Sequence, residues 1–323
     1  MEDGFGRKID YLRVSLTDRC NLRCIYCMPP EGVELSPHNE ILRLEETLRI
    51  CAAAAGLGIS KIKVTGGEPL VRLGVGAFIR SLKHCAGIKT VTLTTNGIAL
   101  GNFLDELPGA GLDAVNVSLD TLDKAKFRRI TRFDKFEQVI CSIKAAQKTR
   151  LAVKINCVPI RGINENEIIE LANFAGQNKI TIRFIELMPL GLGAGLSPVP
   201  QAEIFEKLRR EFGDLTPSAG QEGNGPAIYY NAAGFAGKIG FISALSHNFC
   251  GACNRVRLTV SGFLKPCLSS DIGCDLKAVM RGGGDDKAIA DAIRAAIMLK
   301  PVRHDFCENS SRHKQENMFR IGG

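Results

Sequence analysis

The chain has 323 residues, of which 45% are hydrophobic and 24% charged, and its formal net charge is +8. This composition is typical of a globular protein, and the absence of any apolar run of about 18 residues excludes an ordinary transmembrane helix. The basic residues are scattered, which favours a solvated surface; the alternative is a polyanionic ligand such as a nucleotide or nucleic acid.

Short β-rich segments alternate with helical segments over the first 190 residues. The predicted strands span residues 11–16, 61–65, 90–95, 114–119, 152–160 and 181–187. Segments of helical periodicity lie between them, at 45–58, 75–85, 102–111, 136–148 and 165–178. This alternation is typical of βαβ units and a parallel sheet. Six such units predict an α/β fold with an open, partial β/α barrel, whose chemistry would lie at the carboxyl ends of the strands.

The composition and the pattern of predicted elements change after Met188. A Gly/Pro-rich connector leads into a predicted helix at 201–213, a turn-rich, strand-like stretch at 222–243 and a helix pair at 275–301. We therefore expect a barrel at residues 1–190 and an α+β region at 191–323.

The first residues have neither an apolar core nor a small-residue cleavage site, so we expect a cytoplasmic protein. Twelve cysteines are many for such a chain, and in a reducing compartment metal binding or catalysis explains them better than disulfides. Six form two groups of three. The others are interpreted as small apolar residues: Cys51, Cys85, Cys141, Cys157, Cys274 and Cys307.

The first group, Cys20, Cys24 and Cys27, has the spacing C-x3-C-x2-C on a loop after the first strand. Three thiolates on one loop can hold three corners of a cubane iron–sulfur cluster and leave the fourth iron open. The alternative is a zinc loop that takes its fourth ligand from elsewhere.

This loop, with an aromatic residue before its last cysteine, resembles that of the radical S-adenosylmethionine (SAM) enzymes. The resemblance implies that SAM binds the open iron and yields a 5′-deoxyadenosyl radical. The segment TGGEP (65–69) fits it, because a Gly pair at a strand end allows close approach of the backbone to a ligand. The SAM-binding residues implied are Tyr26, Gly67, Ser118 and Met188.

The second group is Cys250, Cys253 and Cys267. By itself it is also compatible with zinc, completed by Cys274 or His247. Arg255 and Arg257 follow at i and i+2 on a strand-like run, so both guanidinium groups can face one ligand. Arginine suits bidentate phosphate contacts, which a purely structural zinc site does not need.

Together with TTNG (94–97), VNVSLD (115–120), RFIELMPLG (183–191) and the final Gly-Gly, these motifs closely resemble the GTP 3′,8-cyclase family. The resemblance implies two [4Fe-4S] clusters, SAM, and GTP whose guanine binds the open iron of the second cluster. A hydrogen is removed from ribose C3′ and the carbon radical attacks guanine C8, giving (8S)-3′,8-cyclo-7,8-dihydro-GTP. This is the first step of molybdenum cofactor biosynthesis, and cyclic pyranopterin monophosphate synthase acts next.

The resemblance also assigns residues. The GTP-binding set implied is Arg13, Lys63, Thr94, Lys154, Arg183, Arg255, Val256 and Arg257, with Lys61 as an additional contact. The catalytic set implied is Arg13, Arg255, Arg257, Gly322 and Gly323. Two positions depart from the family pattern. Lys63 stands where arginine is common, so it keeps the charge without the fork geometry, and Ser261 replaces an aspartate in a turn.

Three other interpretations fit parts of the sequence. A radical SAM maturase with an auxiliary cluster usually has more C-terminal cysteines and lacks the arginine pair. A redox-sensing iron–sulfur or zinc binding protein would not need a SAM site. An RNA-modifying enzyme would carry an RNA-binding module, and the sequence shows none. We expect no membrane or nucleic-acid partner. An electron donor of unidentified nature is required, and the resemblance implies a homodimer.

Overall fold

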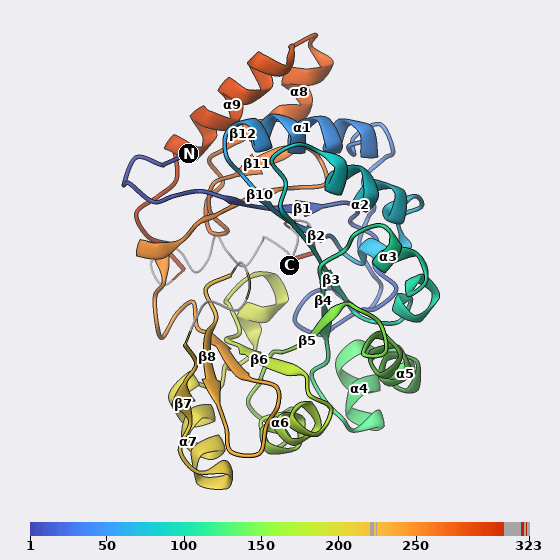
Figure 1. The fold of residues 1–323 in the computed structure, drawn as a ribbon, viewed down its shortest axis with the longest axis vertical. Coiled ribbons are helices and arrows are strands. Elements are labelled where there is room, and N and C mark those ends of the chain that lie inside the picture. The colour runs from blue at the N-terminus through green and yellow to red at the C-terminus, as the bar shows by residue number, and fades with distance from the viewer. Residues whose placement is uncertain (220–222, 224, 307–317, 320, 322–323) are drawn as a thin grey trace.

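The computed structural model describes residues 1–219, 223, 225–306, 318–319 and 321. All six predicted strands of the first 190 residues are present and lie parallel to their neighbours. They are β1 (Tyr11–Ser15), β2 (Lys61–Thr65), β3 (Thr90–Thr95), β4 (Ala114–Ser118), β5 (Ala152–Cys157) and β6 (Thr181–Ile185). The sheet curves around an open centre, so the prediction of a partial parallel β/α barrel is confirmed (Figure 1).

Strands from the C-terminal part extend both edges of this sheet. β10 (Arg255–Leu258) lies parallel to β1, and β9 (Ile239–Ile242) lies parallel to β6. Short antiparallel strands continue the sheet on each side: β11 (Phe263–Lys265), β12 (Cys274–Asp275), β8 (Ile228–Asn231) and β7 (Thr216–Pro217). Strands from both sides of residue 190 therefore share one sheet, and the division into two domains stays a prediction.

Helices cover the outer side of the curved sheet (Figure 1). In the barrel they are α1 (Leu44–Gly56), α2 (Val75–His84), α3 (Glu106–Gly109), α4 (Lys124–Thr131), α5 (Phe136–Ala146) and α6 (Ile168–Gln177). The C-terminal part adds α7 (Gln201–Phe212), α8 (Leu276–Arg281) and α9 (Asp286–Met298). The predicted helix at 102–111 forms only a 3-10 turn and the short α3, and α4 has no counterpart among the predicted elements.

The core lies between the sheet and these helices. Alternate residues of a strand point to opposite faces. In β1, Leu12 and Val14 are buried in the apolar core, so Tyr11, Arg13 and Ser15 face the concave side, which we call the lumen. Each barrel strand thus supplies apolar residues to the helices and leaves polar residues for the lumen.

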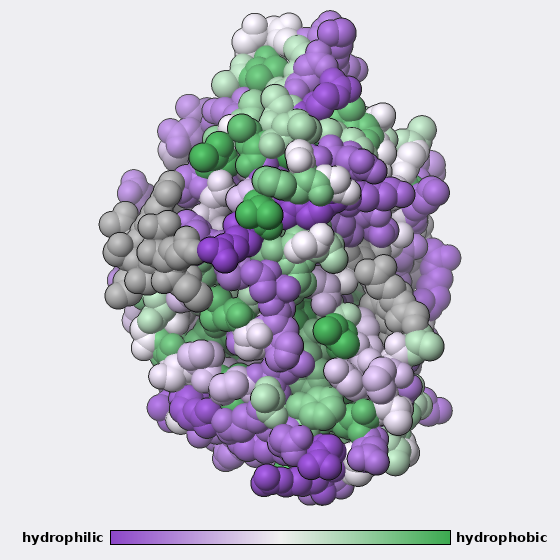
Figure 2. Space-filling view, turned by 90° about the vertical axis from the view of Figure 1, so that its left-hand side faces the viewer, coloured by the Kyte–Doolittle hydropathy of each residue, from purple (hydrophilic) through white to green (hydrophobic). Residues whose placement is uncertain are grey.

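The outer surface is mixed. In the space-filling view toward the side of β7 and β8, hydrophilic residues surround small hydrophobic patches, as expected for scattered charges (Figure 2). Within the described part of the chain, no helix is long and apolar enough to cross a membrane.

Candidate active site

Cations from neighbouring strands meet in the lumen. In the sheet register, Arg13 of β1 lies between Arg257 of β10 and Lys63 of β2, so these side chains project from the same face. Lys63 is only 7% exposed and Arg257 only 8%. Burial lowers the pKa of both groups, and the neighbouring cations lower it further. Burying several positive charges together destabilises the folded protein unless an anion neutralises them.

Buried polar atoms that have no hydrogen-bond partner among the described residues surround these cations. They are Ser15 Oγ, Thr92 Oγ1, Asn116 Nδ2, Asn156 Oδ1 and Arg183 Nε. All come from barrel strands, at positions that face the lumen with Arg13, Lys63 or Lys154. Buried polar groups in native proteins nearly always have hydrogen-bond partners. The lumen therefore fits a polar, anionic ligand that contacts several strands at once.

The predicted lumen residues occupy this face, with one qualification. Thr94 and Ser118 follow the orphaned Thr92 and Asn116 by two residues on their strands and so share their face. Val256, by contrast, is 1% exposed and belongs to the apolar core, opposite Arg255 and Arg257. Only its backbone could reach a ligand. Lys61 is held by an ion pair with Asp10, at 2.9 Å.

The first cysteine loop follows β1 at the carboxyl end of the barrel. Burial raises the pKa of Cys20 to about 11 and that of Cys27 to about 12, and it raises the pKa of Cys24 well above the ordinary value. Metal clusters bind thiolates, so cluster binding must remove these protons. The three thiols are free, which fits the donor set of a cluster with one open iron.

The GGEP turn after β2 packs directly on this loop. A Cβ atom on Gly67 would lie 2.4 Å from the carbonyl oxygen of Arg19. The amide of Gly67 donates to the Thr17 carbonyl at 2.6 Å, and that of Glu68 donates to the Arg19 carbonyl at 2.8 Å. A side chain at position 67 is therefore excluded by the loop that carries Cys20.

Three polar residues that the sequence analysis did not single out support the same loop. Glu68 is fully buried and accepts from Thr95 Oγ1 and the Asn96 amide, both at 2.7 Å. The side chain of Asn96 donates to Asn21 Oδ1 at 2.7 Å. Burial raises the pKa of Glu68 to about 7. All three lie inside the motifs TGGEP, TTNG and VNVSLD, but the sequence does not indicate that their side chains support the cysteine loop.

Tyr26 is held by the third of these residues. Its hydroxyl donates to Asp120 Oδ2 at 2.6 Å, and Asp120 also accepts from the Val158 amide at 2.8 Å. Burial raises the pKa of Asp120 to about 6. The contact joins the first cysteine loop to the carboxyl end of β4.

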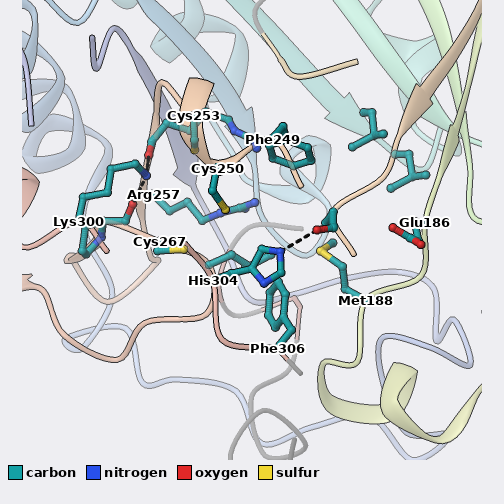
Figure 3. A pocket seen from close by; sticks show the side chains of 16 residues that line it. Glu186, Met188, Phe249, Cys250, Cys253, Arg257, Cys267, Lys300, His304 and Phe306 are labelled. Atoms are coloured by element: carbon teal, nitrogen blue, oxygen red, sulfur yellow. Dashed lines mark hydrogen bonds between the residues drawn. The ribbon is translucent and has the colours of Figure 1, made fainter. Parts of the chain in front are cut away.

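The second cysteine group lines one pocket with both strand arginines. Figure 3 shows Cys250, Cys253 and Cys267 on one side of this pocket and Glu186 and Met188 on the other. Met188, a predicted SAM residue, thus lies at the boundary between the predicted SAM and GTP sites.

Two buried cations hold the loops of this second group. Lys300, 3% exposed, donates to the carbonyls of Arg255 and Pro266, at 2.7 and 2.6 Å. Arg7 donates to the Cys250 carbonyl at 2.9 Å. Although burial raises the pKa of Cys253, the positive charges of Arg255 and Lys300 bring it down to about 7.

The zinc alternative finds little support here. His247 is exposed and Cys274 belongs to β12, and neither lines the pocket. Among the described residues, no group of three or more His, Cys, Asp or Glu side chains could hold a single metal ion. A cubane is compatible with wider spacing, because each of its ligands binds a different iron.

His304 lies in the middle of the same pocket (Figure 3), although no sequence motif predicts a role for it. Its Nε2 donates to the Ala244 carbonyl at 2.7 Å, and its buried Nδ1 has no partner within the part of the chain that the structure describes. Its ring stacks on Phe306, with centroids 4.8 Å apart. A lone histidine 37 residues after Cys267 carries no spacing signal in the sequence.

Gly322 and Gly323 lie outside the described residues. Of the residues just before them, Phe319 and Ile321 are both 2% exposed. The Phe319 amide donates to the thiol of Cys27, while Ile321 packs with Leu190 and Phe306. The end of the described chain therefore contacts the first cysteine loop.

Family profiles and full-length relatives give consistent matches to this chain. Residues 14–175 match the profile of the Radical SAM superfamily, and residues 180–306 match Molybdenum Cofactor Synthesis C. Proteins called GTP 3′,8-cyclase are similar over the full length of both chains: one from Clostridium perfringens (strain 13 / Type A) is 43% identical, and one from Heliobacterium modesticaldum is 45% identical. A relative from Thermodesulfovibrio yellowstonii is 46% identical over 93% of this chain and 94% of its own.

Among solved structures, Streptococcus suis SuiB bound to S-adenosylmethionine has a similar fold, with a TM-score of 0.62. The match covers 89% of this chain and 68% of SuiB, at 16% identity, so it supports the fold alone. The full-length relatives are far closer in sequence. The chain belongs to the GTP 3′,8-cyclase family of radical SAM enzymes.

Proposed function

We propose that this enzyme converts GTP to (8S)-3′,8-cyclo-7,8-dihydro-GTP, the first step of molybdenum cofactor biosynthesis. One observation carries the proposal: a buried, cation-lined lumen with orphaned polar atoms joins two groups of three free cysteines. A nucleoside triphosphate supplies both the negative charge and the hydrogen-bonding groups that such a lumen needs.

The two cysteine groups would hold the clusters. Cys20, Cys24 and Cys27 would bind the first and Cys250, Cys253 and Cys267 the second, with Tyr26, Gly67, Ser118 and Met188 around SAM. When bound, these cofactors supply a 5′-deoxyadenosyl radical and an open iron for the guanine. Gly67 gives the backbone room to approach, and Glu68, Asn96 and Asp120 hold the surrounding loops in place.

The cations would bind the triphosphate. Arg13, Lys63, Lys154, Arg183, Arg255 and Arg257 approach from five strands, and Thr94 adds a hydroxyl. Arginine forks recognise phosphate bidentately, while lysines act as point charges. We keep Gly322 and Gly323 as catalytic residues on the family resemblance, and Val256 as a backbone contact.

The remaining expectations are also proposed on the family resemblance and on cysteine usage. They are a cytoplasmic homodimer, an external electron donor and delivery of the product to cyclic pyranopterin monophosphate synthase. The domain division at residue 190 is kept with them.

The test uses the full chain, reconstituted anaerobically and given GTP, SAM and dithionite. We expect 5′-deoxyadenosine together with a cyclised product of unchanged mass, and we expect none with ATP. Cys24→Ala should abolish both products, whereas Cys141→Ala, at an exposed cysteine away from both groups, should not. SAM cleavage that GTP does not stimulate, but a peptide does, would favour the maturase interpretation instead.

A further inference from the structure

Tyr229 enters the lumen from β8, which lies between β9 and β7 near one end of the sheet. It lies on β8, which pairs with β9 so that Tyr229 faces Gly240, and Gly240 in turn faces Arg183 of β6. A Cβ atom at Gly240 would lie 2.8 Å from Tyr229 Cε1 and 2.9 Å from Arg183 Cγ. The missing side chain at position 240 is therefore the gap through which the phenol ring reaches across β9.

The ring contacts one lumen cation and lies near a second. Lys154 Nζ lies 5.2 Å from the Tyr229 ring centroid, within the range of a cation–π interaction. The ring edge and the Arg183 side chain both border the Gly240 gap. Tyr229 is 5% exposed, so this contact is largely shielded from water. Neither the sequence motifs nor the family resemblance assigned Tyr229 a role.

The neighbouring tyrosine offers a contrast. Tyr230 points to the other face of β8, where it packs on Phe205 and Phe241 at centroid distances of 5.1 and 5.8 Å. The two adjacent tyrosines thus belong to different environments, one in the lumen and one against the core.

An aromatic ring is suited to hold a cation that must bind phosphate. A carboxylate at this place would form an ion pair with Lys154 and repel the incoming anion. The face of a ring attracts the ammonium through its quadrupole and adds no net negative charge. The ring can thus help to orient the lysine side chain without adding an opposing charge.

We propose that Tyr229 is a positioning residue of the triphosphate subsite, which holds Lys154 and Arg183 at the spacing that phosphate binding requires. This rests on the proposed function, since it assumes that the triphosphate occupies the lumen. Gly240 is the second part of the device, because a side chain there would displace the ring and Arg183 together.

The test measures equilibrium dissociation constants of GTP and guanosine, with anaerobically reconstituted enzyme and no SAM. Tyr229→Leu removes the ring and should weaken GTP binding about tenfold while guanosine binding stays constant. Tyr229→Phe keeps the ring and should lose less than about twofold. Gly240→Ala should weaken GTP binding in the same selective way. Tyr230→Leu, the matched control, should leave the ratio of the two constants unchanged.

The outcomes separate this proposal from the function on which it rests. Wild-type protein that binds GTP no better than guanosine would overturn both. Wild-type preference for GTP that survives in Tyr229→Leu, or an equal loss of both ligands, would overturn the role of Tyr229 alone. A Tyr229→Phe variant as weak as Tyr229→Leu would assign the effect to the hydroxyl and reject positioning by the ring.

Discussion

At the scale of one residue, the buried charge of Lys63 lowers the stability of the substrate-free protein and is expected to serve substrate binding. It is buried beside Arg13 and within the field of Arg183, Lys154 and Arg255, and burial is the main reason that its pKa lies well below the ordinary value. The charged form is therefore less stable in the folded protein than in the unfolded chain. Substrate is expected to offset that cost by supplying the opposite charge.

Replacing Lys63 by Met should stabilise the substrate-free protein and impair the reaction. We expect the free energy of unfolding of cluster-free protein to rise by about 1–3 kcal/mol, while kcat/KM for GTP falls at least ~30-fold. Because the pKa of Lys63 is lowered on folding, the unfolded chain binds more protons between its folded pKa and 10.5.

The stability advantage of Lys63→Met should therefore be largest below the folded pKa and shrink as the pH rises toward 10.5. Denaturant unfolding of both proteins across this range measures it. A stability advantage that grows with pH, or a variant less stable than the wild type at neutral pH, would show that the charge of Lys63 does not destabilise the folded protein.

Gly67 shows the opposite constraint, because its missing side chain is what matters. Gly67→Ala should push the first cysteine loop away and lower the iron content from about eight to about four per chain, with loss of SAM binding. Gly109→Ala is the control, because a Cβ atom there meets nothing within 4 Å. Full iron content and SAM affinity in Gly67→Ala would refute the close packing described here.

At the scale of elements, the end of α9 secures the second cysteine group. The helix packs on α1 and α8, and Lys300, two residues after its end, reaches the carbonyls beside Cys253 and Cys267. The helix thus connects the outer layer of the barrel to the walls of the pocket.

Lys300→Met should remove the donor to one buried and one partly buried carbonyl, destabilising this region by about 2 kcal/mol or more. We expect selective loss of the second cluster, so that about four irons remain and SAM binding persists. Lys287→Met, an exposed position on the same helix, should keep all the iron. Iron analysis and electron paramagnetic resonance check this; loss of the first cluster instead would contradict the assignment of Lys300.

Some elements can be predicted from the sequence and others cannot, for physical reasons. The six barrel strands were predictable because β-branched runs alternate with helical periodicity. α4 was not predictable because half of its sequence KAKFRRIT is charged and it buries only Phe127, Ile130 and Thr131. The joining of β10 to β1 was not predictable, since it pairs short segments more than 240 residues apart, Tyr11 with Arg255.

At the scale of the whole molecule, the site forms because the sheet curves and brings the polar faces of its strands together around the lumen. Cysteine spacing identified both metal groups, and family motifs identified most lumen residues. Tyr229, His304 and Lys300 stand alone in the sequence, so only the fold brings them to the lumen or the pocket. The two cysteine groups become parts of one site because β10 adds to β1 and carries Arg255 and Arg257 beside Arg13.

We expect both cysteine groups to serve one lumen: Cys20, Cys24 and Cys27 would hold the cluster and SAM that supply the radical, and the second group would hold the GTP whose ribose loses a hydrogen. Reaction with GTP deuterated at C3′, followed by mass spectrometry of the 5′-deoxyadenosine, tests it directly. We expect 5′-deoxyadenosine with one deuterium. Unlabelled 5′-deoxyadenosine from the same reaction would contradict it.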